Sequence, residues 1–241
     1  MSMKKLALDH VLLITLMLSV AILFSACEDE DDNLDDVEPA EVSYVSLYHG
    51  SPQAGDVDVI IGNNLLNSTA FEYTEYTGYL RFFSGDRYFE FTPYNASNTL
   101  EDTVIFLQED ELYSIFLAND SLNSYELLIT DDNIPDYTLD ESVVRVVHLS
   151  PDAPEVQLSF DEAERNDAFV NVGSISATEF VAFPSGNASF DLETTDGVNL
   201  ATVTNAYFAP ERVYTIIIRG YINPPSGNAQ NLSVQIVNNF Y

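Results

Sequence analysis

The side chains best suited to chemistry in this chain are two histidines that each stand close to a serine. His49 lies two residues before Ser51-Pro52, and His148 lies two residues before Ser150-Pro151. A histidine in that position could act as a general base or as a metal ligand. It could instead fix the passage from strand to turn by bonding the serine hydroxyl or a backbone group. The sequence offers no recognisable oxyanion-binding group and no further zinc ligands, so it predicts the structural role and no catalytic residue.

A second candidate site is a run of oxygen-bearing side chains in the middle of the chain. It comprises Asp131, Asp132, Asn133, Asp136 and Asp140. Calcium takes about six to eight oxygen ligands from carboxylates, amides and carbonyls, and a segment between two β-domains can supply them. The sequence favours a plain charged, solvated linker and predicts no cofactor, and calcium is the one cofactor that it leaves possible.

The third candidate is the single cysteine, Cys27, which ends an N-terminal apolar run. Lysines and an apolar stretch over 11–24 precede it, in the order of an export signal. Leu23-Phe24-Ser25-Ala26-Cys27 resembles the bacterial lipobox. That resemblance implies a signal peptide over 1–26, cleavage between Ala26 and Cys27, and acyl chains such as palmitate on Cys27. Each buried methylene would add about 0.8 kcal/mol to membrane attachment. The alternative is an ordinary cleaved signal with an incidental thiol.

Acidic and small residues dominate the segment 27–41, which therefore predicts an extended, disordered tether. The acids directly after Cys27 also resemble the surface-export signal of lipoproteins in one large group of Gram-negative bacteria. We therefore expect a protein that is lipid-anchored in the outer membrane and exposed at the cell surface.

The charge of the mature chain restricts its partners. After residue 26 it holds six arginines, no lysine and 38 acidic residues, a formal charge of −32. Such a charge repels nucleic acid and anionic lipid headgroups. The sequence thus predicts no nucleic-acid partner, and a membrane contact only through the lipid anchor.

The elements that position these residues are expected to follow an internal duplication of the sequence. The segment 45–52 matches 144–151 at an offset of 99, and Tyr113 matches Tyr214 at an offset of 101. Two repeats of this length predict two domains, over 42–130 and 143–241, joined by a linker over 131–142. Within each repeat, short β-branched and aromatic runs alternate with turn signals. The pattern predicts an all-β chain of two tandem antiparallel, immunoglobulin-like β-sandwich domains. A small closed barrel is the alternative.

The residues around the second histidine support a family resemblance. His148-Leu149-Ser150-Pro151-Asp152-Ala153-Pro154 resembles the signature of domain-of-unknown-function family 4397. The first repeat carries a diverged copy, His49-Gly50-Ser51-Pro52-Gln53-Ala54-Gly55, with Gln53 in place of the aspartate. The resemblance implies a secreted or lipid-anchored β-rich protein and implies no enzymatic activity.

Two further features suggest partners or modification. An aromatic series, Tyr73, Tyr76, Tyr79, Phe82 and Phe83, could stack on a sugar or a protein, or could pack in the core and at its rim. Thr103 and Ser121 stand in short contexts that resemble a bacterial O-glycosylation motif.

Together these observations predict a non-catalytic binding, adhesion or structural module of the cell envelope with an unidentified protein or glycan partner. The alternative is a periplasm-facing accessory lipoprotein for envelope assembly or transport.

Overall fold

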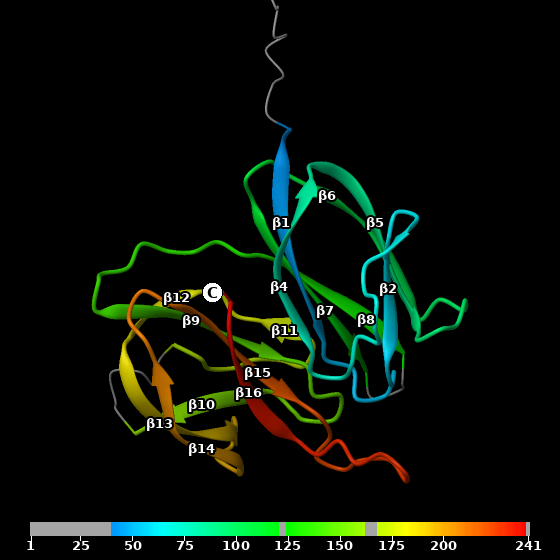
Figure 1. Ribbon diagram of the computed structural model, residues 1–241. Coiled ribbons are helices and arrows are strands. Elements are labelled where there is room, and N and C mark those ends of the chain that lie inside the picture. Colours follow the sequence, from blue (N-terminus) through cyan, green and yellow to red (C-terminus); the bar gives the residue numbers. More distant parts are fainter. Residues whose placement is uncertain (1–39, 121–123, 162–167, 240–241) are drawn as a thin grey trace, which may run out of the picture. The chain divides into compact units, whose positions relative to one another are not determined.

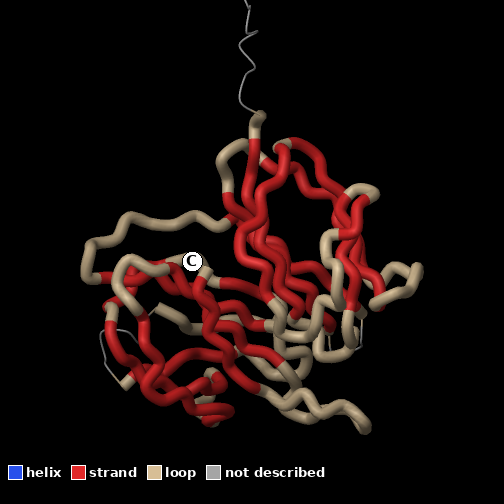
Figure 2. Tube along the Cα trace, viewed as in Figure 1, coloured by secondary structure: helices blue, strands red, loops and turns tan. Residues whose placement is uncertain are grey.

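The computed structural model describes residues 40–120, 124–161 and 168–239. These residues form β-strands, turns and loops, and no helix occurs among them (Figure 2). Accordingly, no described segment is a helix able to cross a membrane. Residues Glu41–Tyr241 form one compact unit, which contains both repeats. The predicted signal peptide, the predicted acylation site at Cys27 and nearly all of the predicted acidic tether lie outside the described residues.

Each repeat contributes eight strands to this unit (Figure 1). Those of the first repeat are β1 (Val42–His49), β2 (Val57–Ile61), β3 (Asn64–Leu65), β4 (Tyr76–Phe83), β5 (Gly85–Pro93), β6 (Glu101–Leu107), β7 (Leu112–Asn119) and β8 (Tyr125–Asp131). Those of the second are β9 (Glu141–His148), β10 (Val156–Phe160), β11 (Ser176–Ala177), β12 (Val181–Pro184), β13 (Gly186–Thr194), β14 (Asn199–Phe208), β15 (Val213–Arg219) and β16 (Ser233–Asn238).

Two sheets form in each repeat. In the first, β4-β1-β7-β8 make what we term the junction sheet, and β3-β2-β5-β6 make the distal sheet. In the second, β11-β9-β15-β16 make the junction sheet, with β12 also paired to β9, and β10-β13-β14 make the distal sheet. The predicted all-β, sandwich-like fold is therefore confirmed.

One pairing in each repeat departs from the predicted antiparallel pattern. β1 runs parallel to β7, with Val45 opposite Tyr113, and β9 runs parallel to β15, with Val144 opposite Tyr214. The other strand pairs of the four sheets are antiparallel. Two parallel neighbouring strands must be joined by a crossover connection. In each repeat, the strands of the distal sheet lie in the sequence between the two parallel strands and form part of this connection.

Alternation along the strands builds a separate core inside each repeat. In the first, Val45 and Leu47 of β1 pack with Phe89 and Phe91 of β5. In the second, Val144 and Val146 of β9 belong to a cluster with Phe183, Phe190 and Phe208. Residues at every second position of a strand share one face, and this explains why the period of two in the sequence marks the core.

The opposite faces of the two junction sheets are buried as well. Tyr48 and Phe116 of the first repeat pack in one apolar cluster with Val147, Ile217 and Val237 of the second. The central strands β1, β7, β9 and β15 are consequently buried on both faces along most of their length. Such strands read as nearly continuous apolar runs, as in parallel sheets covered on both sides.

The connection between the repeats is shorter than the predicted linker over 131–142. β8 includes Asp131, and β9 begins at Glu141, so both ends of that range belong to strands. Asp132 is buried, although its acidic neighbourhood suggested a solvated segment.

Candidate functional site

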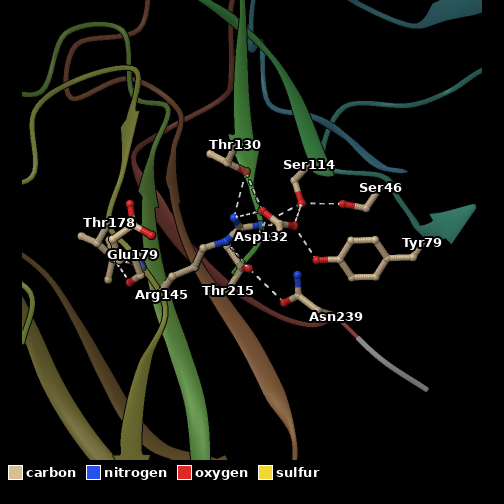
Figure 3. A network of polar contacts seen from close by, with 11 residues as sticks. Ser46, Tyr79, Ser114, Thr130, Asp132, Arg145, Thr178, Glu179, Thr215 and Asn239 are labelled. Atoms are coloured by element: carbon tan, nitrogen blue, oxygen red, sulfur yellow. Dashed lines mark hydrogen bonds and ion pairs between the residues drawn. The ribbon is translucent and has the colours of Figure 1, made fainter. Parts of the chain in front are cut away.

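A network of polar side chains crosses the junction between the repeats (Figure 3). At its centre Arg145 of β9 forms an ion pair with Asp132, with 2.5 Å between Nη1 and Oδ1. Arg145 also donates through Nη2 to the Ser114 hydroxyl at 2.8 Å, and through Nε to Thr215 Oγ1 at 3.1 Å. Five hydrogen bonds thereby join one guanidinium group to acceptors from both repeats.

The carboxylate of Asp132 is equally well surrounded. Tyr79 and Ser114 both donate hydroxyl protons to its Oδ2, and Thr130 donates to its Oδ1 at 2.7 Å. Burial and the adjacent Asp132 carboxylate raise the pKa of Tyr79, so its phenol stays protonated and acts as a donor. The Arg145 guanidinium carbon lies 4.3 Å from the centre of the Phe180 ring, which adds a cation–π contact.

The two halves of this network occupy matching positions in the repeats. Ser46 matches Arg145 at the offset of 99, and Ser114 matches Thr215 at the offset of 101. Asp132 matches Asn239, because each follows the last strand of its repeat and donates its N–H to the start of the neighbouring strand, at Leu112 and Val213. The same face of each repeat therefore packs on the equivalent face of the other repeat. In two of these matched pairs one residue is charged, Arg145 or Asp132, and the other is neutral.

The structure does not gather the predicted calcium ligands into a cluster. Asp132 is engaged by Arg145, whereas Asp131, Asn133, Asp136 and Asp140 are exposed. In the described ranges, no group of three or more histidine, cysteine or acidic side chains is placed to hold a metal ion. A hydrogen bond from Thr138, at 2.6 Å, lowers the pKa of Asp140.

Both histidines of the repeated motif are buried and bonded to the turn that follows them. His148 donates through Nε2 to the Pro154 carbonyl at 3.1 Å, and its Nδ1 accepts the N–H of Ser150 at 3.2 Å. His49 makes the matching bond to the Gly55 carbonyl at 2.6 Å. The His148 ring accepts through one nitrogen and donates through the other, so it is neutral and unavailable as a base. These contacts fit the role in which each histidine fixes the passage from strand to turn.

The other residues of the motif fix the turns, and one of them, Pro52, is bonded to the second repeat. The Ser51 hydroxyl donates to Asn119 at 2.7 Å, and the Pro52 carbonyl accepts from the Asn228 side chain at 2.7 Å. The Asp152 carboxylate accepts the N–H groups of Ile222 and Asn223, at 2.7 and 2.8 Å. Gln53 stands where Asp152 stands in the second repeat, and it does not make this pair of bonds.

Protonation of the buried histidines should link stability to pH. Burial lowers the pKa of both His49 and His148 below the usual 6.5. Below about pH 6.5 the two histidines are therefore protonated in the unfolded chain but stay neutral in the folded chain. Their contribution to the free energy of unfolding is complete above that pH and is lost as the pH falls below it. Each ring contributes a slope of up to about 1.4 kcal/mol per pH unit.

Urea denaturation between pH 7.5 and 5.5 measures this slope, over a range in which ordinary carboxylates stay ionised. The double variant His49→Gln/His148→Gln should be less stable at pH 7.5 but show a flatter profile below pH 6.5. Identical slopes in variant and parent would contradict the assignment.

The aromatic series divides between core, junction and surface. Phe82 packs against the first core, Tyr79 joins the polar network, and the Tyr76 hydroxyl donates to the Asn239 carbonyl at 3.3 Å. The Tyr73 ring lies edge-on to His49 at 6.0 Å between centroids. Phe83 is left 65 % exposed. Of the two O-glycosylation candidates, Thr103 lies in β6 and Ser121 lies outside the described residues.

Phe83 lines a groove at the open side of the first repeat, between β3 and β4. The groove has a volume of about 760 Å³, and its apolar lining comprises Val42, Ile61, Leu65, Leu66, Phe82 and Phe83. Arg81 and Arg87 also line it. Arg87 is fixed by the carbonyls of Ser84 and Asp86, at 2.8 and 2.7 Å, while Arg81 is exposed.

This β3–β4 groove is suited to hold a small ligand or a peptide. Its volume lies in the range of small-molecule and peptide sites, and it combines an apolar lining with a few polar groups. The sequence indicated the aromatic residues that line it but not the groove, because β3 and β4 come from different sheets and their distance is set by the fold.

Comparison with known proteins identifies one domain family. The family described as "Domain of unknown function (DUF4397)" matches residues 43–159. The matched range includes both histidine motifs, the lining residues of the β3–β4 groove apart from Val42, and both partners of the buried ion pair. None of the curated proteins compared matches the chain.

Proposed function

We propose that this chain, which carries a DUF4397 domain over residues 43–159, is a non-catalytic binding module held at the cell envelope by a lipid on Cys27. The β3–β4 groove would be its binding site. The observation that carries the proposal is the combination of an open apolar groove with two arginines on a strongly acidic chain. Exposed apolar surface of this kind is typical of binding sites.

The arginines favour a ligand with negative charge. The mature chain has six arginines, and two of them line this groove. One ion pair is found among the described residues, and it belongs to Arg145 and not to the groove. An exposed guanidinium group beside apolar side chains suits a ligand that carries both an anionic and an apolar part.

The contacts of the two histidines support a non-catalytic role. Both rings are buried and bonded to backbone groups, so the side chains that most resembled catalytic bases are committed to their turns. Residues 28–41 would hold the groove at a distance from the membrane, because like charges extend a chain.

Binding at the groove can be measured with the dye anilinonaphthalene sulfonate, which combines apolar rings with an anionic group. A soluble chain that begins at residue 28 should bind one dye molecule with enhanced fluorescence. Arg81→Glu and Phe83→Ser should each weaken binding about tenfold or more. Tyr207→Ser is the matched control, because Tyr207 is equally exposed at 62 % on β14 of the other repeat. Equal affinity in all four proteins would refute the site, and unchanged melting temperatures would show that each variant is folded.

The anchor is tested in intact cells of a bacterial host. The parent protein should be found in the membrane fraction and should be digested by external protease without lysis. Cys27→Ala should be released or remain unprocessed, because no acyl chain can be attached. Normal membrane retention of Cys27→Ala would refute the lipid anchor. Protection from protease until the outer membrane is broken would favour the periplasm-facing alternative.

A further inference from the structure

Beside Arg81 and Phe83 of β4, the edge of the first junction sheet has no neighbouring strand among the described residues. β4 pairs with β1 on one side, and among the described strands none pairs with it on the other. Of its eight residues, Arg81, Phe82 and Phe83 line the β3–β4 groove, and the register of its pairing with β1 shifts between Ser46 and Tyr48. The matching edge of the second repeat is broken into β11 and β12, of two and four residues, and it ends at Pro184. Short and proline-containing edges discourage strand addition, whereas a long free edge permits it.

The hydrogen-bond pattern shows which backbone groups face outward. Ser84 donates its N–H to the Glu41 carbonyl, so the pair formed by these two residues is hydrogen-bonded. Bonded and non-bonded pairs alternate in an antiparallel ladder, which leaves Phe83 and Arg81 in non-bonded pairs with Val42 and Tyr44. Tyr44 accordingly donates its N–H to Glu111, on the far side of β1. The N–H and C=O groups of Arg81 and Phe83 therefore point to the free edge.

The side chains beside this edge select the chemistry of a partner. Phe83 and Leu65 are 65 % and 57 % exposed at the groove, and they offer apolar contacts. Arg81 and Arg87 offer positive charge where the rest of the chain is acidic. A second copy of this chain would bring its own Arg81 to the same edge, and like charges directly opposite each other are destabilising.

We propose that the free edge of β4 binds an extended acidic segment of a partner polypeptide, which adds as a strand and places an apolar side chain in the β3–β4 groove. Main-chain hydrogen bonds from Arg81 and Phe83 supply affinity, and the groove and its arginines supply selectivity. This inference rests on the proposed function, since it names the ligand class of the same groove.

Synthetic heptapeptides test the proposal. The probe alternates aspartate with valine, and its binding to the chain that begins at residue 28 is followed by isothermal calorimetry. Methylation of the peptide nitrogens on one edge of the strand should weaken binding about tenfold, while methylation on the other edge should leave it unchanged, because only one edge faces β4. A peptide with lysine in place of aspartate should not bind. Arg81→Glu should abolish the preference for the acidic peptide.

The possible outcomes distinguish strand addition at β4 from the proposed function of the groove as a binding site. Equal effects of methylation on both edges, or equal affinity for acidic and basic peptides, would overturn strand addition. Dye binding at the groove without peptide binding would also overturn it, while leaving a small apolar anion as the ligand of the proposed function. Failure of both probes would refute the groove as a binding site. Concentration-dependent dimers that Arg81→Glu strengthens would show that the edge takes a second copy instead.

Discussion

Replacing Arg145 with methionine is expected to lower the free energy of unfolding by about 3–5 kcal/mol. Methionine keeps most of the length of the side chain but removes the positive charge. Asp132 would then remain buried as an unpaired carboxylate, and its hydroxyl donors supply no compensating charge. Urea denaturation of the chain that begins at residue 28, followed by circular dichroism at pH 7.5, measures the loss.

Removing the second charge should restore much of this stability. In the double variant Arg145→Met/Asp132→Asn neither partner is charged, so the penalty of an unpaired buried carboxylate disappears. The double-mutant cycle isolates the coupling between the two side chains. A loss below about 1 kcal/mol in Arg145→Met, or strictly additive losses, would mean that the pair is screened like a surface ion pair.

Replacing Gly220 with alanine is expected to cost about 2–4 kcal/mol. Gly220 follows β15 with φ at +82°, a left-handed conformation that a Cβ atom disfavours. An added Cβ would also lie 2.3 Å from the carbonyl oxygen of Asn231, which is backbone and has no rotamer to change. The loop that would have to shift is tied to the first repeat through the bond from Asn228 to Pro52.

Gly227→Ala provides the matched control for this effect. Gly227 has a similar φ of +89°, but an added Cβ would meet no atom within 4 Å. It should therefore show the conformational cost alone, about 1 kcal/mol. Thermal and urea denaturation of both variants would separate backbone strain from steric overlap, and equal losses at the two positions would rule out the overlap.

Local sequence patterns were sufficient to predict the strands but not their partners. The alternation of Val45 and Leu47 marks a face buried in the first core, and the turn signals at Ser51-Pro52 and Ser84-Gly85 separate consecutive strands. The parallel pairing of β1 with β7 joins residues that are far apart in the chain, and no short-range signal encodes it.

The junction between the repeats was missed although the sequence carries a sign of it. Val143-Val144-Arg145-Val146-Val147 is apolar at both odd and even positions, and a strand with one solvated face would alternate. Arg145 interrupts this run and resembles a surface residue, while Asp132 resembles a linker acid. The two side chains are buried against each other, and the pair can be recognised only once both repeats are placed together.

The β3–β4 groove could not be predicted from the sequence for a related reason. Phe82 and Phe83 are adjacent in the chain, yet one packs in the core and the other is exposed. The prediction that the aromatic series would divide between core and rim follows from the alternation of a strand. The arginines that give the groove its character come from β4 and β5, and their position relative to Leu65 depends on how the sheets are stacked.

The matched positions at the junction also decide how many repeats the assembly can hold. Two copies of the first repeat packed by this face would set one Asp132 against another, and two copies of the second would oppose two guanidinium groups. The two charges neutralise each other only when one first repeat packs on one second repeat. The face is then fully used by a single contact, as it is in a symmetric dimer. A duplicated face that had kept identical residues could have recruited repeats from neighbouring chains. By placing the acid in one half and the base in the other, this chain satisfies the contact between its two repeats internally.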